Sequence, residues 1–226
     1  MTGCLYLVSL PIGNPDDLTL RARRILRQVS CLAAEDPRAA QILLRRHRIH
    51  TPVTSYHNEN KEEKAPMLVS RLQEGRHVAL VCDAGTPLID DPGAHLVQAA
   101  IRAGLRVVPV PGPSALLAAL VVSGLPCQRV LFLGRLPRSR TARLRLLNSL
   151  RAEPGTIVLY VASDRLPDTL GALRAMLGDR QMALALDLTK PGEVVLRGTL
   201  SRIIRLVQEQ APSGEVTLVV KGRGRQ

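Results

Sequence analysis

The chain has 226 residues, of which 46% are hydrophobic, and this length suits one large domain or two small ones. Its 31 Lys and Arg residues exceed its 19 Asp and Glu residues, which gives a net charge of +12. Such an excess favours a polyanionic partner, nucleic acid first and an anionic membrane surface second, with general solubility as the alternative explanation.

The cysteines and the apolar runs exclude several classes of protein. Cys4, Cys31, Cys82 and Cys127 are far apart, with no CxxC pair and no neighbouring cluster of His, so we expect neither a bound metal nor a disulfide framework. No apolar run approaches the roughly 20 residues of a transmembrane helix, and the N-terminus lacks a signal-peptide pattern. We therefore expect a cytoplasmic protein that does not enter the membrane.

Strands and helices alternate through the first half of the sequence. Short apolar runs that end at Gly, Pro or Asp predict strands at residues 5–10, 31–34, 53–56, 78–82 and 105–110. Apolar residues at helical spacing predict helices between these strands. We expect Asp16 or Asp17 to cap the first helix and the later helices to end at Leu44, Gln73 and Ala103.

The second half begins with an expected helix at residues 115–123, capped by Ser114, and then changes its order of elements. After Gly124 and Pro126, we expect strands at residues 130–133, 156–161, 182–188, 193–197 and 215–220. Further helices are expected at residues 141–151, 167–177 and 200–210. Because one helix separates the last three strands, we predict a mixed sheet. The chain as a whole is predicted to be α/β, with domains at residues 1–112 and 113–226.

Two loops of the first half are candidates for a small-molecule site, because ligands of α/β proteins bind at the carboxyl ends of strands. The loop at residues 83–93 is long and acidic, and Gly85 allows its backbone to approach a ligand. The loop at residues 109–114 leads into a helix whose first amides suit an anion. An Asx-turn made by Asp83 is the alternative for the first loop. The absence of GxGxxG and P-loop motifs disfavours a conventional nucleotide fold.

These stretches together resemble a known family. In order, and at the spacings of RsmI-type enzymes, the chain contains LVSLPIGNPDDLTLRA, AAEDPR, LVCDAGTPLIDDPG, VPVPGPSA and SGLP, and later LDLTKPGE and GEVTLVVKG. Those enzymes are ribosomal RNA small-subunit 2′-O-ribose methyltransferases of the tetrapyrrole (class III) methylase superfamily. The resemblance implies two α/β domains with S-adenosylmethionine bound in a cleft between them. It also implies a cytoplasmic homodimer that acts on small-subunit ribosomal RNA or on the assembled subunit.

The resemblance also implies cofactor contacts, most of them backbone or apolar, which suits a ligand that is read by its shape. In the first domain and the start of the second, the expected contacts are Ile12, Asp83, Gly85, Thr86, Ile89, Ser114 and Ala115. Later in the second domain, they are Val161 and Leu186.

The chain departs from the family at three places. Family members read close to FYESPHR where this chain has LYVASDR, so Val161 replaces a Glu. They carry Arg-Glu where Leu186 and Asp187 stand, and Thr where Pro37 stands. The joint loss of the Glu and the Arg is consistent with a compensated change, with an altered substrate, or with lost activity.

Methyl transfer to a ribose requires that the hydroxyl be aligned and that its proton be removed. Glu35, Asp36, Arg38 and His57 follow strands of the first half and are candidates for this work. We favour Glu35 as the general base or orienting group. For His57 we favour an exposed loop histidine, since a single His is poor evidence for acid–base chemistry.

Two arginine clusters are candidates for phosphate contacts. The first, on an expected helix, reads equally well as a solvated face, and it contains Arg21, Arg23, Arg24 and Arg27. The second is denser and begins in a loop, which favours RNA. With Arg38 added, the expected RNA contacts are Arg38, Arg135, Arg138, Arg140 and Arg143, and Arg145 lies beside them. Since aromatic residues are few, recognition should depend on phosphate, ribose and RNA shape.

The leading hypothesis is therefore an S-adenosylmethionine-dependent methyltransferase that 2′-O-methylates a cytidine of small-subunit ribosomal RNA. One alternative keeps the fold and changes the substrate to a small tetrapyrrole. Another is a catalytically weakened relative that still binds RNA or the cofactor.

Overall fold

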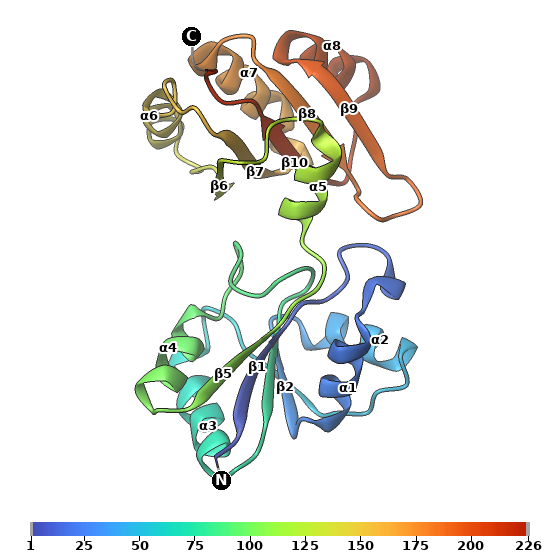
Figure 1. The fold of residues 1–226 in the computed structure, drawn as a ribbon, viewed down its shortest axis with the longest axis vertical. Coiled ribbons are helices and arrows are strands. Elements are labelled where there is room, and N and C mark those ends of the chain that lie inside the picture. The colour runs from blue at the N-terminus through green and yellow to red at the C-terminus, as the bar shows by residue number, and fades with distance from the viewer. Residues whose placement is uncertain (1, 225–226) are drawn as a thin grey trace. The chain divides into compact units, whose positions relative to one another are not determined.

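The computed structural model describes residues 2–224 and divides into two compact units, Met1–Ser114 and Ala115–Gln226. Each unit contains one five-stranded sheet with helices packed against it (Figure 1).

The sheet of the first unit is parallel and has the strand order β3-β2-β4-β1-β5. Its strands are β1 Cys4–Val8, β2 Cys31–Ala34, β3 Val53–Ser55, β4 Val78–Val81 and β5 Arg106–Val110. Every residue of β2 and β4 is buried, as expected for inner strands of a parallel sheet that is covered on both faces. The continuous apolar runs of the sequence correspond to these strands.

Helices cover both faces of this sheet (Figure 1). The helices are α1 Leu20–Gln28, α2 Pro37–Arg46, α3 Lys61–Gln73 and α4 Ala94–Arg102. Buried residues of α1 and α2, such as Leu26 and Leu44, form one core with Val8 and Val81. Those of α3 and α4 form a second core on the other face. The alternation predicted from the sequence is confirmed.

The prediction that Asp16 or Asp17 caps the first helix is wrong. Thr19 is the cap of α1, because its side chain accepts a hydrogen bond from Ala22 N at 3.0 Å. Asp16 and Asp17 belong to a separate 3-10 turn, η1 Pro15–Asp17, which is capped by Asn14. Pro15 suits the first position of that turn, and the extended backbone after it delays the start of α1.

The sheet of the second unit is mixed, as predicted, with the order β6-β7-β10-β8-β9. Its strands are β6 Val130–Arg135, β7 Thr156–Ala162, β8 Gln181–Leu186, β9 Val194–Thr199 and β10 Glu215–Val220. β6 pairs with β7 in parallel, and the other three pairings are antiparallel. β8 ends at Leu186, earlier than expected, because Asp187 has a φ of 48° and turns the chain.

The helices of the second unit are α5 Ala115–Ser123, α6 Arg140–Ser149, α7 Leu166–Leu177 and α8 Leu200–Gln210, with a 3-10 turn η2 Ser163–Arg165. Leu147 of α6, Leu170 of α7 and Ile203 of α8 share one core with Leu159 and Leu218 of the sheet. α5 packs against β8 and β10. Arg135, a predicted RNA contact, ends β6. The segments LYVASDR and LDLTKPGE contain the ends of β7 and β8.

Candidate cofactor site and basic surface

Three loops meet at the carboxyl edge of the first sheet. They follow β1, β4 and β5, which are parallel neighbours in the order β4-β1-β5. Because parallel neighbours end at the same edge, the loops at residues 9–14, 82–93 and 111–114 lie side by side. This edge is where open α/β sheets bind ligands.

Leu10 and Gly85 join the first two loops through their backbones. Leu10 N donates to Gly85 O at 2.8 Å, and Gly85 N donates to Leu10 O at 3.0 Å. Gly85 has a φ of +77°, which L-residues rarely adopt, and a Cβ placed there would lie 3.4 Å from Ile12 Cγ2. The bridge therefore favours glycine for its backbone conformation, and it keeps the buried Ile12 against the loop.

A chain of hydroxyl groups holds all three loops together. Ser9 Oγ lies 3.0 Å from Thr86 Oγ1, and Thr86 Oγ1 donates to Pro113 O at 3.1 Å. Since Thr86 has one hydroxyl proton, Ser9 is the donor in its bond with Thr86. Ser9 is 1% exposed. Thr86 therefore organises the loops with its proton, and only its remaining lone pair is available to a ligand.

Gly112 allows the third loop to approach the first. A Cβ at this position would lie 2.9 Å from the Cβ of Ser9, a distance that real side chains do not adopt. Ser9 N also donates to Val110 O at 3.3 Å, so the contact continues the pairing of β1 with β5. The glycine between two prolines is thus explained by close packing, and Ser114 lies two residues after it.

Asp83 connects the loop after β4 with the loop after β2. Its Oδ1 accepts a hydrogen bond from Asp36 N at 3.1 Å, while Asp36 caps α2 by accepting from Arg38 N at 2.7 Å. The side chain of Asp83 is exposed, and within residues 2–224 its Oδ2 has no hydrogen-bond partner. Asp83 thus caps a neighbouring loop and retains an acceptor for a ligand.

The buried thiol of Cys82 contacts the backbone of the loop after β4. Its Sγ donates to Ala84 O at 3.2 Å and lies 3.5 Å from Gly85 O. Burial raises the pKa of Cys82, and the nearby carboxyl group of Asp91 raises it further. A thiol that keeps its proton is a poor nucleophile, so Cys82 has a structural role.

The rest of the loop after β4 adopts unusual backbone conformations. Leu88 and Asp90 have φ values of 73° and 67°, and Gly93, which begins α4, has a φ of 134°. Left-handed conformations are uncommon for a residue such as Leu and are concentrated at ligand-binding segments. Between them Ile89, a predicted contact, is 37% exposed. Its side chain is thus available to a ligand.

The candidates for acid–base work stand at the same edge. Glu35 is half-buried and directly follows β2, next to the Asp36 amide that binds Asp83. His57 follows β3, and its Nε2 lies 3.1 Å from Asn60 Nδ2. The same Asn60 side chain accepts a hydrogen bond from His57 N at 2.9 Å. His57 is therefore held by Asn60 rather than being a freely exposed loop histidine.

Val161 and Leu186 lie in one row across the second sheet. Val161 of β7 and Leu186 of β8 both pair with Val216 of β10, which lies between them. Directly opposed residues point to the same face, so all three join the core under α7 and α8. The two positions at which the resemblance implies a Glu and an Arg are thus neighbours across one strand, and apolar side chains occupy both.

The turn after β8 is fixed by charge. Lys190 Nζ lies 2.8 Å from Asp187 Oδ1 and 3.1 Å from Glu215 Oε2. The hydrogen bond from Lys190 lowers the pKa of Asp187, and the same bond raises the pKa of Lys190. Thr189 N also donates to Glu193 Oε2 at 2.7 Å. The turn is therefore preorganised by bonds within the unit.

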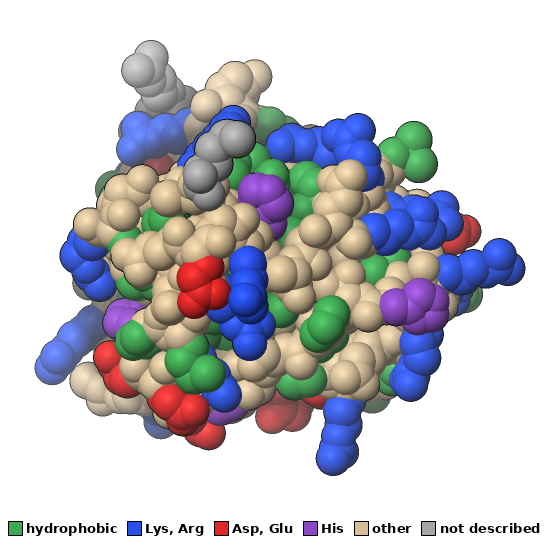
Figure 2. Space-filling view, turned by 90° about the horizontal axis from the view of Figure 1, so that it is seen from below, with side chains coloured by type: hydrophobic (Ala, Val, Ile, Leu, Met, Phe, Trp, Pro, Cys, Tyr) green, Lys and Arg blue, Asp and Glu red, His purple; other side chains and the backbone are tan. Residues whose placement is uncertain are grey.

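The predicted RNA-contact residues are spread over both units. Arg38 is exposed in the first turn of α2, and Arg135 is exposed at the end of β6. In the first arginine cluster, Arg27 Nη2 donates to His47 O at 3.0 Å and so joins α1 to the end of α2. Figure 2 shows Lys and Arg side chains scattered over the face drawn there, along its outline and near its centre. General basicity therefore does not mark a single site.

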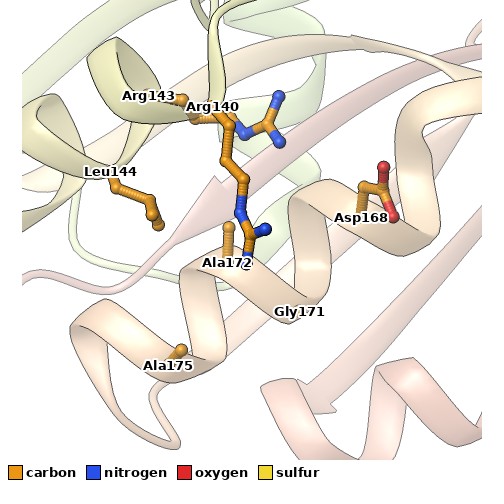
Figure 3. A pocket seen from close by; sticks show the side chains of 7 residues that line it. All are labelled: Arg140, Arg143, Leu144, Asp168, Gly171, Ala172 and Ala175. Atoms are coloured by element: carbon orange, nitrogen blue, oxygen red, sulfur yellow. The ribbon is translucent and has the colours of Figure 1, made fainter.

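One hollow in the second unit brings two arginine side chains together. It lies between α6 and α7, has a volume of about 460 Å³, and is shown in Figure 3. We call it the α6–α7 groove, and it is lined by Arg140, Arg143, Leu144, Asp168, Gly171, Ala172 and Ala175. Of the predicted contacts, the groove brings Arg140 and Arg143 together, and Arg138 precedes them in the chain. Asp168 and the small residues of α7 were missed, since no local pattern distinguishes them from an ordinary helix.

Two absences hold for the part of the chain that the structure describes. Within it, no group of three or more His, Cys, Asp or Glu side chains is placed to hold a metal ion. Over the same residues, no helix is both long enough and apolar enough to cross a membrane.

Ser9, Gly112 and Pro113, which organise the three loops, were not predicted as site residues. Their only signal was their position at the ends of β1 and β5.

Comparison with known proteins places the chain in a sequence family. Residues 4–204 match the family Tetrapyrrole (Corrin/Porphyrin) Methylases. The chain is 43% identical to the ribosomal RNA small subunit methyltransferase I of Halalkalibacterium halodurans, over 98% of this chain and 77% of that protein. It is 41% identical to the protein of the same name from Thermotoga maritima, over 98% of this chain and 99% of that protein.

A solved structure is similar in fold. It is the uroporphyrin-III C-methyltransferase of Thermus thermophilus complexed with S-adenosyl homocysteine. The TM-score is 0.65 at 21% identity, and the alignment covers 96% of this chain and 97% of that one. At this identity the likeness concerns the fold, including the parallel sheet and the mixed sheet described above.

Proposed function

The chain belongs to the tetrapyrrole methylase family, and we propose that it is an S-adenosylmethionine-dependent methyltransferase that 2′-O-methylates a cytidine of small-subunit ribosomal RNA. The single observation that carries this proposal is the identity of 43% and 41% to two ribosomal RNA small subunit methyltransferases, over 98% of the chain in each case. In the Thermotoga maritima protein, the match also covers 99% of the relative.

The loops after β1, β4 and β5 fit the cofactor. They provide backbone amides and carbonyls, a carboxylate oxygen of Asp83 with no partner within residues 2–224, and an approach past Gly85 that no side chain blocks. A ligand with hydroxyl groups and an ammonium group can use such acceptors. We propose that the first-unit contacts are Ile12, Asp83, Gly85, Thr86, Ile89 and Ser114. We propose that those of the second unit are Ala115 and, through their backbones because their side chains pack in the core, Val161 and Leu186.

When bound, S-adenosylmethionine would supply a methyl group already activated by its sulfonium. The residues of the chain then have two tasks, to orient a ribose hydroxyl and to take its proton. Glu35 follows β2 at the same edge and beside the Asp36–Asp83 hydrogen bond, so we propose it as the base or orienting group. The raised pKa of Cys82 supports a role for that thiol outside proton transfer.

The RNA side of the proposal rests on charge. Arg38, Arg135, Arg138, Arg140 and Arg143 would contact phosphate groups, for which guanidinium is well suited. The net charge of +12 would draw the chain to the subunit and make binding sensitive to salt. An RNA substrate of this kind also implies action in the cytoplasm.

We also propose a homodimer, as the family resemblance implies. Helix α5 is apolar at every position before its last residue, Ser123, yet Leu117 and Val121 on it are 58% and 75% exposed. A second copy of the chain would cover such side chains. Light scattering of wild type and of a Leu117→Glu, Val121→Glu variant tests this point, and a wild-type monomer would refute it.

Methyl transfer to isolated subunits tests the function. The protein is incubated with labelled S-adenosylmethionine and small subunits that lack the modification, and the RNA is digested to nucleosides. We expect label in 2′-O-methylcytidine. Calorimetry without RNA measures cofactor binding separately. Cofactor binding without label in RNA would overturn the substrate, and label in a tetrapyrrole would establish the small-molecule alternative.

Glu35→Gln tests the proposed base within the same assay. The expected result is a lower kcat with unchanged cofactor affinity, because the amide cannot accept the proton but keeps the size of the side chain. Glu59→Gln is the matched control, since Glu59 is exposed in the loop before α3. Equal rates for the two variants would remove Glu35 from the mechanism.

A further inference from the structure

We propose that the α6–α7 groove binds the backbone of the RNA strand, with Arg140 and Arg143 holding phosphate and Asp168 accepting a hydrogen bond from a ribose 2′-hydroxyl. This inference rests on the proposed function and extends it from a set of basic residues to a defined site. It names the sugar, as well as the phosphate, as a feature that the groove recognises.

The shape of the groove suits a chain of nucleotides. α6 contributes the arginines, and α7 contributes Asp168 in its first turn and the small residues Gly171, Ala172 and Ala175 after it (Figure 3). A Cβ added at Gly171 would meet nothing within 4 Å, so the groove is open above the α7 backbone. Its volume of about 460 Å³ is within the usual range for ligand sites.

The polar groups of the groove lack partners inside the protein. Among residues 2–224, the side chains of Arg140, Arg143 and Asp168 form no ion pair and no hydrogen bond, and Arg143 Nε is buried without an acceptor. Buried N–H groups are nearly always paired in folded proteins. An external acceptor at this position would satisfy the donor that the fold leaves open.

Other arginines of the same unit differ from those of the groove, because their guanidinium groups bind carbonyl groups of the protein. Arg180 donates to the carbonyl groups of Leu177, Lys221 and Arg151, and Arg197 donates to Val122 O at the end of α5. Those guanidinium groups connect elements of the fold. The arginines of the groove do not connect elements in this way, so their N–H groups are available to a ligand.

The mixture of charges selects RNA among polyanions. Two guanidinium groups attract phosphate, but a lone carboxylate beside them would repel it unless it met a hydrogen-bond donor. The ribose 2′-hydroxyl is such a donor, and it distinguishes RNA from DNA. No aromatic residue is among the seven that line the groove, so base stacking is not expected.

The test uses oligouridylate and oligodeoxyuridylate of equal length, which differ only in the 2′-hydroxyl. Fluorescence anisotropy of labelled oligonucleotides gives affinity over a range of salt concentrations. We expect Arg140→Gln and Arg143→Gln each to weaken RNA binding about tenfold and to lower the salt slope by about 0.7 per lost contact. Arg205→Gln, an exposed residue of α8, is the control with the same change of charge.

Two further variants separate sugar recognition from charge. Asp168→Ala is expected to abolish the preference for RNA over DNA while retaining phosphate contacts. Gly171→Met fills the groove without altering charge. It should not destabilise α7, because glycine disfavours helix interiors. We expect it to weaken RNA binding about tenfold, whereas Gln208→Met on the exposed face of α8 leaves binding unchanged.

The outcomes distinguish this inference from the proposed function. If wild type methylates subunit RNA but all groove variants bind oligouridylate as tightly as Arg205→Gln, the groove is not an RNA site and the function stands. Equal affinity of wild type for the two oligonucleotides would remove the role of Asp168. If no RNA is methylated although the groove variants weaken binding, the groove stands and the proposed reaction fails.

Discussion

The three loops of the first unit and the α6–α7 groove of the second are built in opposite ways. In the loops, Ser9, Thr86 and Pro113 satisfy one another, and Leu10 is bonded to Gly85. In the groove, Arg143 has a buried donor without an acceptor in the described chain. Because the hydrogen bonds of the loops are made within the protein, the loops form a preorganised site that binds a small ligand through backbone groups. Unpaired charge gives a surface that adapts to a polymer, with affinity that depends on salt.

The largest effect should come from breaking the rigid site at Gly85. Gly85→Val forces a branched residue to a φ of +77° and presses on Ile12, so we expect cofactor binding to be lost in calorimetry. Gly104→Val is the control, because Gly104 also has a positive φ, of +68°, but nothing within 4 Å of its Cβ position. Both variants should lose about 1–2 kcal/mol of unfolding free energy from backbone strain. Retained cofactor binding by Gly85→Val would show that the loops are not the cofactor site.

Thr86→Val tests the hydroxyl chain with little change in volume. It leaves Ser9 Oγ and Pro113 O without their partner, so we expect a loss of about 1–3 kcal/mol in the free energy of unfolding, measured in urea. Cofactor affinity should fall in parallel as the loops loosen. Thr54→Val in β3 removes a hydroxyl that makes no hydrogen bond within the described residues and should be nearly neutral. A stable Thr86→Val with full affinity would mean that the chain of hydroxyls does not organise the site.

Variants of the loops and of the groove should each impair only one of the two ligands. Arg143→Gln should weaken oligouridylate binding about tenfold yet leave the affinity for S-adenosylmethionine unchanged. Thr86→Val should do the reverse. Calorimetry and anisotropy on the same preparations measure both quantities. If either variant impairs both ligands equally, the two regions are coupled and the contrast drawn between them is wrong.

The smallest effect is expected at a third kind of site, the paired charges of Asp187 and Lys190. Because the folded pKa of Asp187 is lowered, its stabilisation is complete above the ordinary value of about 3.9 and is lost as the pH falls through the folded pKa. For Lys190 the pKa is raised, so that stabilisation is present below about 10.4 and is lost as the pH rises through the folded value.

Asp187→Asn removes this contribution while suiting the φ of 48°, which Asn tolerates. At neutral pH we expect a loss below about 1 kcal/mol, since the pair is partly exposed. The difference from wild type should vanish in acid, as measured by thermal unfolding from neutral to low pH. Asp164→Asn, at an exposed residue without an ion pair in the described chain, should show no such trend. A difference that persists in acid would point to packing in place of charge.

The sequence alone predicted most strands and helices because local signals bounded them. β2, β10, α3 and α8 end where predicted, at Gly, Pro or changes of apolar period. The cap of α1 was misplaced, since Asp16 and Thr19 are both good caps and the choice depends on the turn at Pro15. β8 was made too long, since Leu188 continues its apolar pattern and only the φ of Asp187 ends it.

The site was less accessible than the fold. Motif resemblance pointed to Gly85 and Thr86, but the pairing of Leu10 with Gly85 and the path from Ser9 to Pro113 join segments far apart in the chain. The groove needed two helices to be packed before Asp168 could be seen beside Arg140. Such features depend on tertiary contacts, and no periodicity records them.

The buried thiol of Cys82 is a probe of how often the loop after β4 opens. Cys127 is exposed and will react with a thiol reagent at once, whereas Cys82 is buried and can react only when its loop opens. The rate at which Cys82 is modified therefore reports how often the segment above it comes apart, as amide exchange does for a backbone group. Cys31, buried within the sheet, provides the slower reference against which local opening is separated from global unfolding.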